Sequence, residues 1–149
     1  MKSTTTIKPV IVHVTEEHHV ALARQAAVAL AEEIGLKRVL VYHVATGVSE
    51  LANNLFSHAT RGGRITLAAL RREGEIGIEV VAEDDGPGIP DVERALQGGF
   101  STSGGLGGGL PGVRRLMDEF EIRSTVGVGT RIVARKLQVC SPPTPALPR

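Results

Sequence analysis

The sequence has few aromatic residues and a single cysteine. Its 149 residues include no Trp, one Tyr and three Phe, so the base-stacking platforms of many nucleic-acid-binding proteins are missing. The single cysteine, Cys140, excludes an internal disulfide framework and fits a reducing cytoplasm. A net charge of +1 supplies no broad basic field. We therefore expect a cytoplasmic protein with no direct nucleic-acid partner.

Long apolar runs are also absent. No stretch approaches the ~18 consecutive apolar residues that a membrane span needs, and the N-terminal MKSTTTIKPV contains no apolar signal region. We therefore expect no membrane contact. The length fits one domain. We expect that domain to occupy residues 1–138, and the proline-rich residues 139–149 to form a disordered tail.

Hydrophobic periodicity predicts the order of the secondary-structure elements. Alternating β-branched and polar residues predict strands over residues 7–14, 64–71, 75–84, 121–127 and 129–137. Spacings of three and four predict helices over about 15–35 and 37–60, a short helix over 91–99, and a helix that starts near Pro111 and includes Phe120. This order fits an α+β two-layer sandwich, in which a mainly antiparallel sheet carries helices on one face.

Several residues are typical of element ends. We expect Thr15 to cap the first long helix and Gly35 to end it. Asp91 is placed to cap the short helix. Pro87 and Gly88 predict a tight turn, in which the glycine takes a positive φ. The proline at position 9 favours an edge position for the first strand.

Glu50 and Asn54 form the first candidate site, in the segment SELANN. Residues four apart on a helix lie on one face, and Leu51 and Leu55 mark the buried stripe beside them. A carboxylate and a carboxamide at this place suit binding of Mg²⁺ or positioning of a nucleophile. A solvated polar face is the alternative from spacing alone.

Asp84, Gly86 and Gly88 form the second candidate site, in the pattern D-x-G-x-G directly after an apolar strand. An aspartate at a strand end can accept from an exocyclic amine, and backbone without side chains can pass close to a flat ligand. A simple β-turn is the alternative.

The third candidate is the glycine-rich stretch STSGGLGGGLPG at residues 101–112. Gly107, Gly109 and Gly112 formally match the dinucleotide pattern GxGxxG, but no strand precedes them, and the chain has no Gly-Lys-Ser/Thr for a Walker A loop. A glycine-rich run before a helix N-terminus presents backbone N–H groups that suit phosphate. A flexible linker is the alternative, although the well-patterned helix that follows at once disfavours it.

Together these motifs resemble the GHKL ATPase and kinase superfamily, whose nucleotide fold is the Bergerat fold. The strings SELANN, AEDDGPGIPD, GGFSTSGGLGGGLPGVRRLMDEF and VGVGT carry the resemblance, which spans roughly residues 8–137. Within this superfamily the chain is similar to the anti-sigma-factor serine/threonine kinases, especially the RsbT-like switch kinases of the stressosome.

The resemblance implies a role for each matching residue. Asn54 would bind the Mg²⁺ that bridges the ATP phosphates. Glu50 would be the catalytic base, or at least the group that orients the acceptor hydroxyl. Asp84 would bind the adenine amino group, Gly86 and Gly88 would let the backbone approach the base, and Thr130 would support the adenine end. The ATP lid would run from about Gly98 to Gly109, with its ATP-contacting residues at Ser101, Thr102, Ser103, Gly104, Gly105, Leu106, Gly107, Gly108 and Gly109. His58 matches a histidine often found in the wider family.

The resemblance also implies an activity and partners. The chain would be an ATP-dependent protein kinase for a serine or threonine of a STAS-domain antagonist protein. Once released, it would activate a PP2C-type phosphatase. The alternative is an anti-sigma factor that mainly sequesters a sigma factor. The sequence leaves open which output applies and whether the chain forms a homodimer.

Overall fold

A computed structural model describes residues 7–58, 62–97 and 109–140. Within these residues the elements are β1 (Val10–Val14), α1 (His18–Ile34), α2 (Arg38–His58), β2 (Gly63–Arg72), β3 (Glu75–Asp84), α3 (Val92–Leu96), α4 (Gly109–Leu116), β4 (Glu119–Thr125) and β5 (Gly129–Val139). The predicted order of strands and helices is therefore confirmed.

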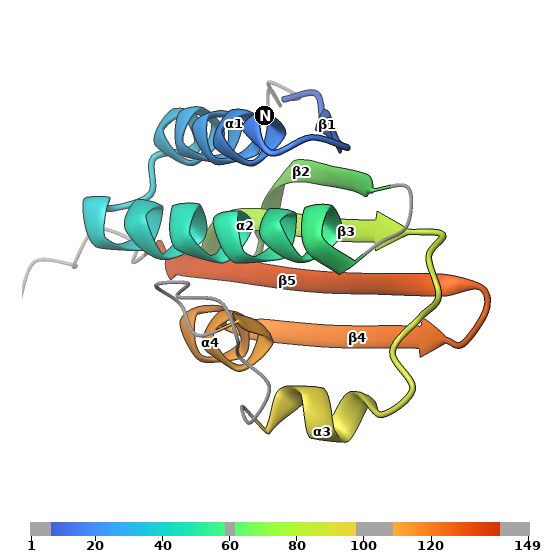
Figure 1. The fold of residues 1–149 in the computed structure, drawn as a ribbon. Coiled ribbons are helices and arrows are strands. Elements are labelled where there is room, and N and C mark those ends of the chain that lie inside the picture. Colours follow the sequence, from blue (N-terminus) through green and yellow to red (C-terminus); the bar gives the residue numbers. More distant parts are fainter. Residues whose placement is uncertain (1–6, 59–61, 98–108, 141–149) are drawn as a thin grey trace, which may run out of the picture.

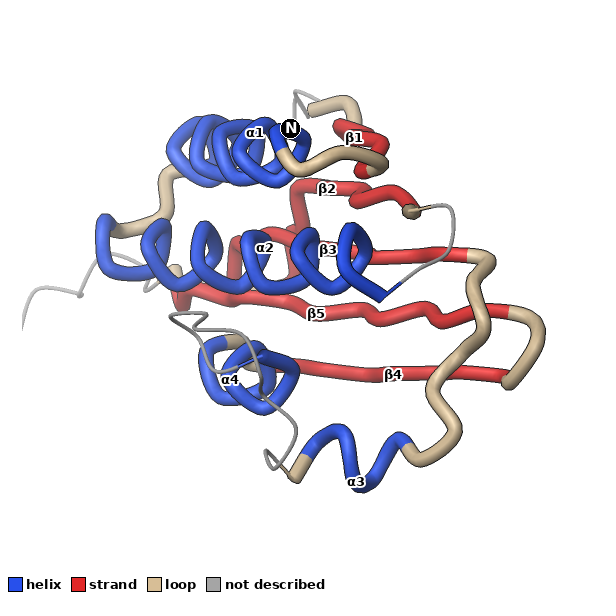
Figure 2. Tube along the Cα trace, viewed as in Figure 1, coloured by secondary structure: helices blue, strands red, loops and turns tan. Residues whose placement is uncertain are grey.

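The strands form an antiparallel sheet in the order β1-β2-β3-β5-β4. β1 lies at one edge, as Pro9 predicts. Helices α1, α2 and α4 lie on one face of this sheet, as Figures 1 and 2 show. The predicted α+β two-layer architecture is confirmed. None of the helices in the described ranges has the length and apolar character of a membrane span.

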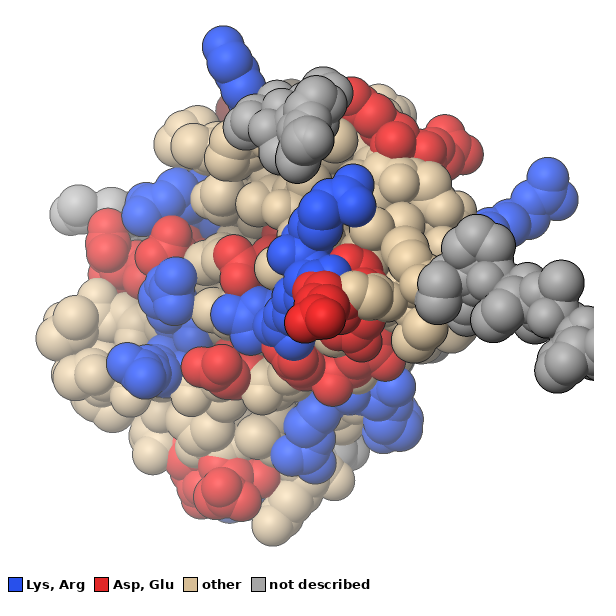
Figure 3. Space-filling view, turned by 180° about the vertical axis from the view of Figure 1, so that it is seen from behind, with Lys and Arg blue, Asp and Glu red and all other residues tan. Residues whose placement is uncertain are grey.

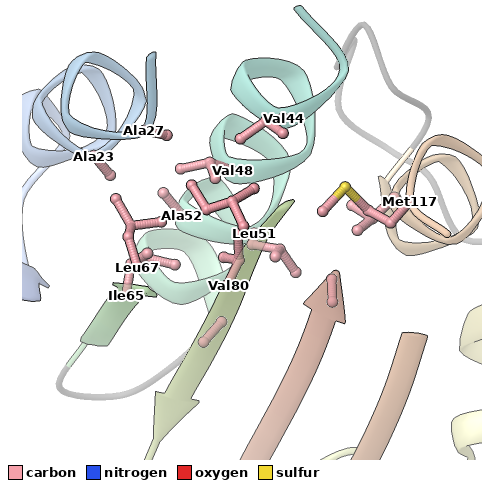
Figure 4. Packing of buried hydrophobic residues seen from close by; sticks show 14 of the residues in the cluster. Ala23, Ala27, Val44, Val48, Leu51, Ala52, Ile65, Leu67, Val80 and Met117 are labelled. Atoms are coloured by element: carbon pink, nitrogen blue, oxygen red, sulfur yellow. The ribbon is translucent and has the colours of Figure 1, made fainter. Parts of the chain in front are cut away.

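The core lies between α2 and the middle of the sheet (Figure 4). Helix α2 contributes a buried apolar stripe at helical spacing, which meets the inward side chains of β2 and β3. These fully or almost fully buried residues are Val44, Val48, Leu51, Ile65, Leu67 and Val80. Burial of each such side chain contributes about 1.5–3 kcal/mol, so this contact fixes the position of α2 on the sheet.

Two of the three predicted helix ends are confirmed. Gly35 ends α1 in a left-handed conformation with φ of 101°, and the Asp91 side chain accepts from the backbone N–H of Arg94 at 3.1 Å. The prediction for Thr15 is wrong. Helix α1 begins at His18, and no side chain caps it. Instead the His19 ring reaches back, and its Nδ1 accepts from the backbone N–H of Thr15 at 3.1 Å.

The prediction that Phe120 belongs to the helix is also wrong. α4 ends at Leu116, and Phe120 lies in β4, where it pairs with Ala134. The chain leaves the helix because the Asp118 N–H donates to the carbonyl of Arg135 at 2.8 Å, which joins it to the sheet. Phe120 still contacts the core. Its apolar side chain fits the spacing of a helix, but it points inward from a strand.

Strand β5 ends slightly later than expected. It reaches Val139, and the N–H of Cys140 donates to the carbonyl of Gly74 at 2.7 Å. The strand therefore continues one residue beyond the expected domain end at residue 138, and a hydrogen bond holds the next residue. The rest of the expected tail, residues 141–149, lies outside the described residues.

The face of the sheet away from the helices carries interleaved charges (Figure 3). Arg135 donates to Glu79 at 2.8 Å and to Glu119 at 3.1 Å, and Arg72 donates to Glu119 at 2.6 Å. The hydrogen bond from Arg72 is the main cause that lowers the pKa of Glu119 to about 2, with a second contribution from Arg135. The charges on this face are thus largely paired with one another.

We expect Glu119→Gln to lower the free energy of unfolding at pH 7. The folded-state pKa of Glu119 lies below its ordinary value of 4.5, so its contribution is present above about pH 4.5 and is lost as the pH falls towards about 2. Urea unfolding at a series of pH values measures this. Glu121→Gln is the control, because Glu121 is 59% exposed and lies 3.6 Å from Arg135. A difference from wild type that stays constant from pH 7 to pH 2 would contradict the expectation.

Candidate functional site

Glu50 and Asn54 lie one turn apart in the C-terminal half of α2. Glu50 is only 5% exposed, whereas Asn54 is half-buried and its neighbour Asn53 is exposed. A carboxylate that is this well buried needs polar partners and is costly to retain. The alternative of a solvated polar face therefore does not hold for Glu50.

Asp84 is the last residue of β3 and lies beside Gly63 and Thr130 on the two neighbouring strands. It pairs with Gly63 of β2 on one side and with Thr130 of β5 on the other. Its side chain is half-buried, and Oδ1 accepts from the backbone N–H of Gly86 at 2.7 Å. This hydrogen bond orients the carboxylate at the end of β3. The hydrogen bond therefore links Asp84 to Gly86, the first glycine of the predicted D-x-G-x-G site.

Gly63 brings α2 close to Asp84. A Cβ placed on Gly63 would lie 2.8 Å from Cδ2 of Leu55 and 3.1 Å from Cβ of Asp84. The nearest atom to such a Cβ would be the carbonyl oxygen of Glu83 on β3. A side chain at residue 63 would therefore disturb the pairing of β2 with β3 and would also displace the Leu55 side chain of α2. Because Asn54 precedes Leu55, the glycine brings the two predicted motifs together.

Ser124 ties the loop after β3 to the sheet. Its Oγ accepts from the backbone N–H of Ile89 at 2.6 Å and lies 2.9 Å from the Thr130 hydroxyl. A second connection runs from the N–H of Gly127 to the carbonyl of Pro87, at 2.9 Å. Sequence reasoning missed Ser124. The sequence pattern that could have indicated Ser124 is a polar residue two positions after Ile122 and four after Phe120, on the side of β4 that faces inward.

The two glycines of the D-x-G-x-G motif differ in what the structure shows for them. Gly86 is buried. Gly88 has a φ of 82°, and a Cβ placed there would lie 2.6 Å from the carbonyl oxygen of Thr125. The positive φ predicted for Gly88 is confirmed. The loop therefore passes against the β4–β5 turn at backbone distance.

Helix α4 begins at Gly109, which has a φ of 72°. Pro111 lies in its first turn, as predicted. The predicted lid residues 98–108, which include Ser101, Thr102, Ser103, Gly104, Gly105, Leu106, Gly107 and Gly108, lie outside the described residues. His58 is the last residue of α2.

Asn54 has the chemistry of the predicted magnesium ligand. Among residues 7–58, 62–97 and 109–140, no three His, Cys, Asp or Glu side chains gather as a metal site. Mg²⁺ usually takes one or two protein ligands and completes its shell with phosphate oxygens and water. The half-buried carboxamide of Asn54 is a suitable oxygen donor for such a shell.

Comparison with known proteins identifies relatives of this chain. Residues 13–136 match the family described as Histidine kinase-like ATPase domain. The chain is 45% identical over 125 residues to the Serine/threonine-protein kinase RsbT of Bacillus subtilis, covering 84% of this chain and 93% of that protein. It is 35% identical over 117 residues to the Anti-sigma F factor of Caldanaerobacter subterraneus subsp. tengcongensis, covering 75% and 80%.

A solved structure shares the fold. It contains the RsbU and RsbW domains of Rv1364c from Mycobacterium tuberculosis, with a TM-score of 0.58 and 18% identity. The match covers 87% of this chain and 32% of that longer chain. The likeness therefore concerns the fold of one part of that protein.

We expect Gly88→Ala to lower the free energy of unfolding by about 1–3 kcal/mol more than Gly74→Ala. Both glycines have a positive φ, but a Cβ at Gly74 meets nothing within 4 Å, whereas one at Gly88 meets the Thr125 carbonyl. The difference between the two variants therefore isolates the close approach of the loop to the β4–β5 turn. Urea denaturation measures both values, and equal losses would show that this approach is not required.

Proposed function

Because this chain belongs to the family of histidine kinase-like ATPase domains, we propose that it is an ATP-dependent protein serine/threonine kinase and partner switch. Its substrate would be a serine or threonine of a STAS-domain antagonist protein. When released from that protein, it would activate a PP2C-type phosphatase in bacterial stress signalling. The 45% identity to a protein named as a serine/threonine-protein kinase supports this choice.

The observation that carries the proposal is the meeting of α2 with the end of β3. Gly63 allows Leu55 and Asp84 to approach each other closely, so the helix that carries Glu50 and Asn54 lies against the strand that ends in Asp84. A nucleotide whose base binds near Asp84 can then direct its phosphates towards α2. If Glu50, Asn54 and Asp84 only stabilised the fold, they would not need to lie near one another.

Asp84 would bind the adenine amino group. The Gly86 N–H occupies Oδ1, so Oδ2 is the oxygen that would accept from the exocyclic amine. Gly86 and Gly88 would let the loop backbone pass along the base, and Thr130, in register with Asp84, would support the same end of the nucleotide. The Ser124 hydrogen bonds hold this loop in position before any ligand arrives.

Asn54 and Glu50 would act at the phosphate end. Mg²⁺ bound with the nucleotide would neutralise charge on the phosphate oxygens, and phosphoryl transfer depends mainly on such neutralisation and on positioning. Asn54 would provide the protein oxygen ligand for that ion. Glu50 would accept the proton of the substrate hydroxyl, and its burial excludes water that would compete for the same hydrogen bonds.

The first turn of α4 would contact the phosphates together with the lid. Backbone N–H groups at a helix N-terminus and the positive end of the helix dipole favour an anion. Gly105, Gly107 and Gly109 are the glycines proposed to lie on the phosphates, with the hydroxyls of residues 101–103 beside them. Of these residues, Gly109 belongs to the described part of the chain.

A second function, anti-sigma activity by sequestration, has support from the 35% identical Anti-sigma F factor. The higher identity and coverage of the kinase named RsbT favour the switch kinase. Pull-downs with ATP and with ADP distinguish the two functions. Recovery of a STAS-domain protein that then accepts phosphate supports the kinase, whereas recovery of a sigma factor without phosphate transfer supports the alternative.

We expect Asp84→Asn to weaken the binding of ATP and ADP by about a hundredfold while the fold stays intact. The asparagine oxygen can still accept from the Gly86 N–H, but its amide would meet the adenine amino group as a second donor. Isothermal titration calorimetry measures binding, and the melting temperature without nucleotide measures the fold. Asp85→Asn is the control, because the neighbouring Asp85 is exposed. Unchanged affinity of Asp84→Asn would remove this residue from the site.

We expect Glu50→Gln to retain ATP binding and to slow phosphate transfer to the STAS-domain protein by about 10²–10⁴-fold. Glutamine keeps the size of the buried side chain but cannot accept the hydroxyl proton. Transfer from radiolabelled ATP measures the rate, and Asn53→Ala on the exposed side of α2 is the control. A transfer rate equal to that of wild type would show that Glu50 is not the base.

A further inference from the structure

Lys136 is a buried lysine on the side of β5 that faces the helices. The residue is 7% exposed, and lysine is almost never this buried unless it is paired. Its Nζ donates to the main-chain carbonyl of Leu116 at 2.7 Å and lies 3.8 Å from Oδ1 of Asp118. Leu116 is the last residue of α4. The ammonium group therefore binds the C-terminal end of this helix.

The contact has a clear physical basis. The last carbonyls of a helix have no partner within the helix, and a cation there interacts favourably with the negative end of the helix dipole. Asp118 adds two more connections to β5. Its backbone N–H donates to the carbonyl of Arg135 at 2.8 Å, and its Oδ2 accepts from the N–H of Leu137 at 2.6 Å. The end of α4 is thus joined to β5 through side-chain and backbone bonds.

The same end of α4 also packs closely on α2. Met117 directs its sulfur towards α2 (Figure 4), where Gly47 offers no side chain, and a Cβ at Gly47 would lie 3.4 Å from that sulfur. Burial and then the charge of Lys136 lower the pKa of His43 on α2, whereas the charge of Asp118 raises it. The C-terminal end of α4 is therefore held between β5 and α2.

We propose that Lys136 is a positioning residue for the phosphates of ATP, because it fixes the C-terminal end of α4 and so sets where its first turn lies. This inference rests on the proposed function, in which that first turn contacts the phosphates. Helix α4 has 8 residues and is a short rigid rod of about 1.5 Å per residue. A shift or tilt at Leu116 therefore moves Gly109, while Asp84 on β3 stays in place.

The test compares ATP with adenosine, which lacks the phosphates. We expect Lys136→Met to weaken ATP binding about tenfold, because a displaced first turn of α4 would weaken its hydrogen bonds to the charged phosphate oxygens. Adenosine affinity should stay within about twofold of wild type. Competition with a fluorescent adenine nucleotide measures both affinities on the full chain.

Arg135→Met is the matched control. Arg135 precedes Lys136 on β5, but its side chain lies on the opposite face of the sheet, where it pairs with Glu79 and Glu119. Its substitution should leave the ratio of ATP to adenosine affinity unchanged. Equal weakening of ATP and adenosine in Lys136→Met, or no weakening of either, would overturn the positioning role. Failure of the wild-type chain to bind ATP would instead overturn the proposed function, and this inference with it.

Gly47→Val changes the contact between α2 and the C-terminal end of α4. It is the variant to test if Lys136→Met does not fold. The added side chain displaces Met117 and so shifts the end of α4 without removing a charge. It should weaken ATP binding and spare adenosine binding, in the same direction as Lys136→Met. ATP binding equal to that of wild type in a folded Gly47→Val chain would overturn the inference.

Discussion

The packing of α2 on the middle of the sheet is the contact on which the other features depend. Val48 and Leu51 meet Ile65, Leu67 and Val80 in the buried core. An α-helix has 3.6 residues per turn, so this contact also fixes the direction of every other side chain on α2. Glu50 and Asn54 lie beside the buried stripe, at spacings of three and seven from Gly47, which lies against Met117. The core therefore sets the geometry of the candidate site.

The second constraint is backbone spacing at the end of the sheet. Three strands meet there, with Asp84 between Gly63 and Thr130, and Gly63 leaves room for α2 to approach. Gly88 allows the following loop to pass against the β4–β5 turn. Hydrogen bonds of Ser124 then fix that loop. A site built this way is largely preformed, because backbone positions rather than long side chains define it.

Much of this arrangement was predictable from local sequence signals. The stripe on α2, the strand order along the chain, and the roles of Gly35, Asp91 and Gly88 follow from periodicity and from residue types that favour one backbone conformation. The end of α4 was not predictable from the sequence. Phe120 fits helical spacing, but a hydrogen bond from the Asp118 N–H to the distant Arg135 carbonyl begins a strand instead. Ser124 and Lys136 were missed for a related reason. Each acts through partners distant in the sequence, and neither belongs to a motif with a recognisable spacing.

The proposed function requires ATP to bind between α2, the end of β3 and the start of α4. A crystal structure of the full chain with Mg²⁺ and a non-hydrolysable ATP analogue tests it most directly. We expect the adenine amino group within hydrogen-bond distance of Asp84, the Asn54 oxygen on the metal ion, and the phosphates at the first turn of α4. A nucleotide bound elsewhere, or one whose adenine makes no contact with Asp84, would contradict the account.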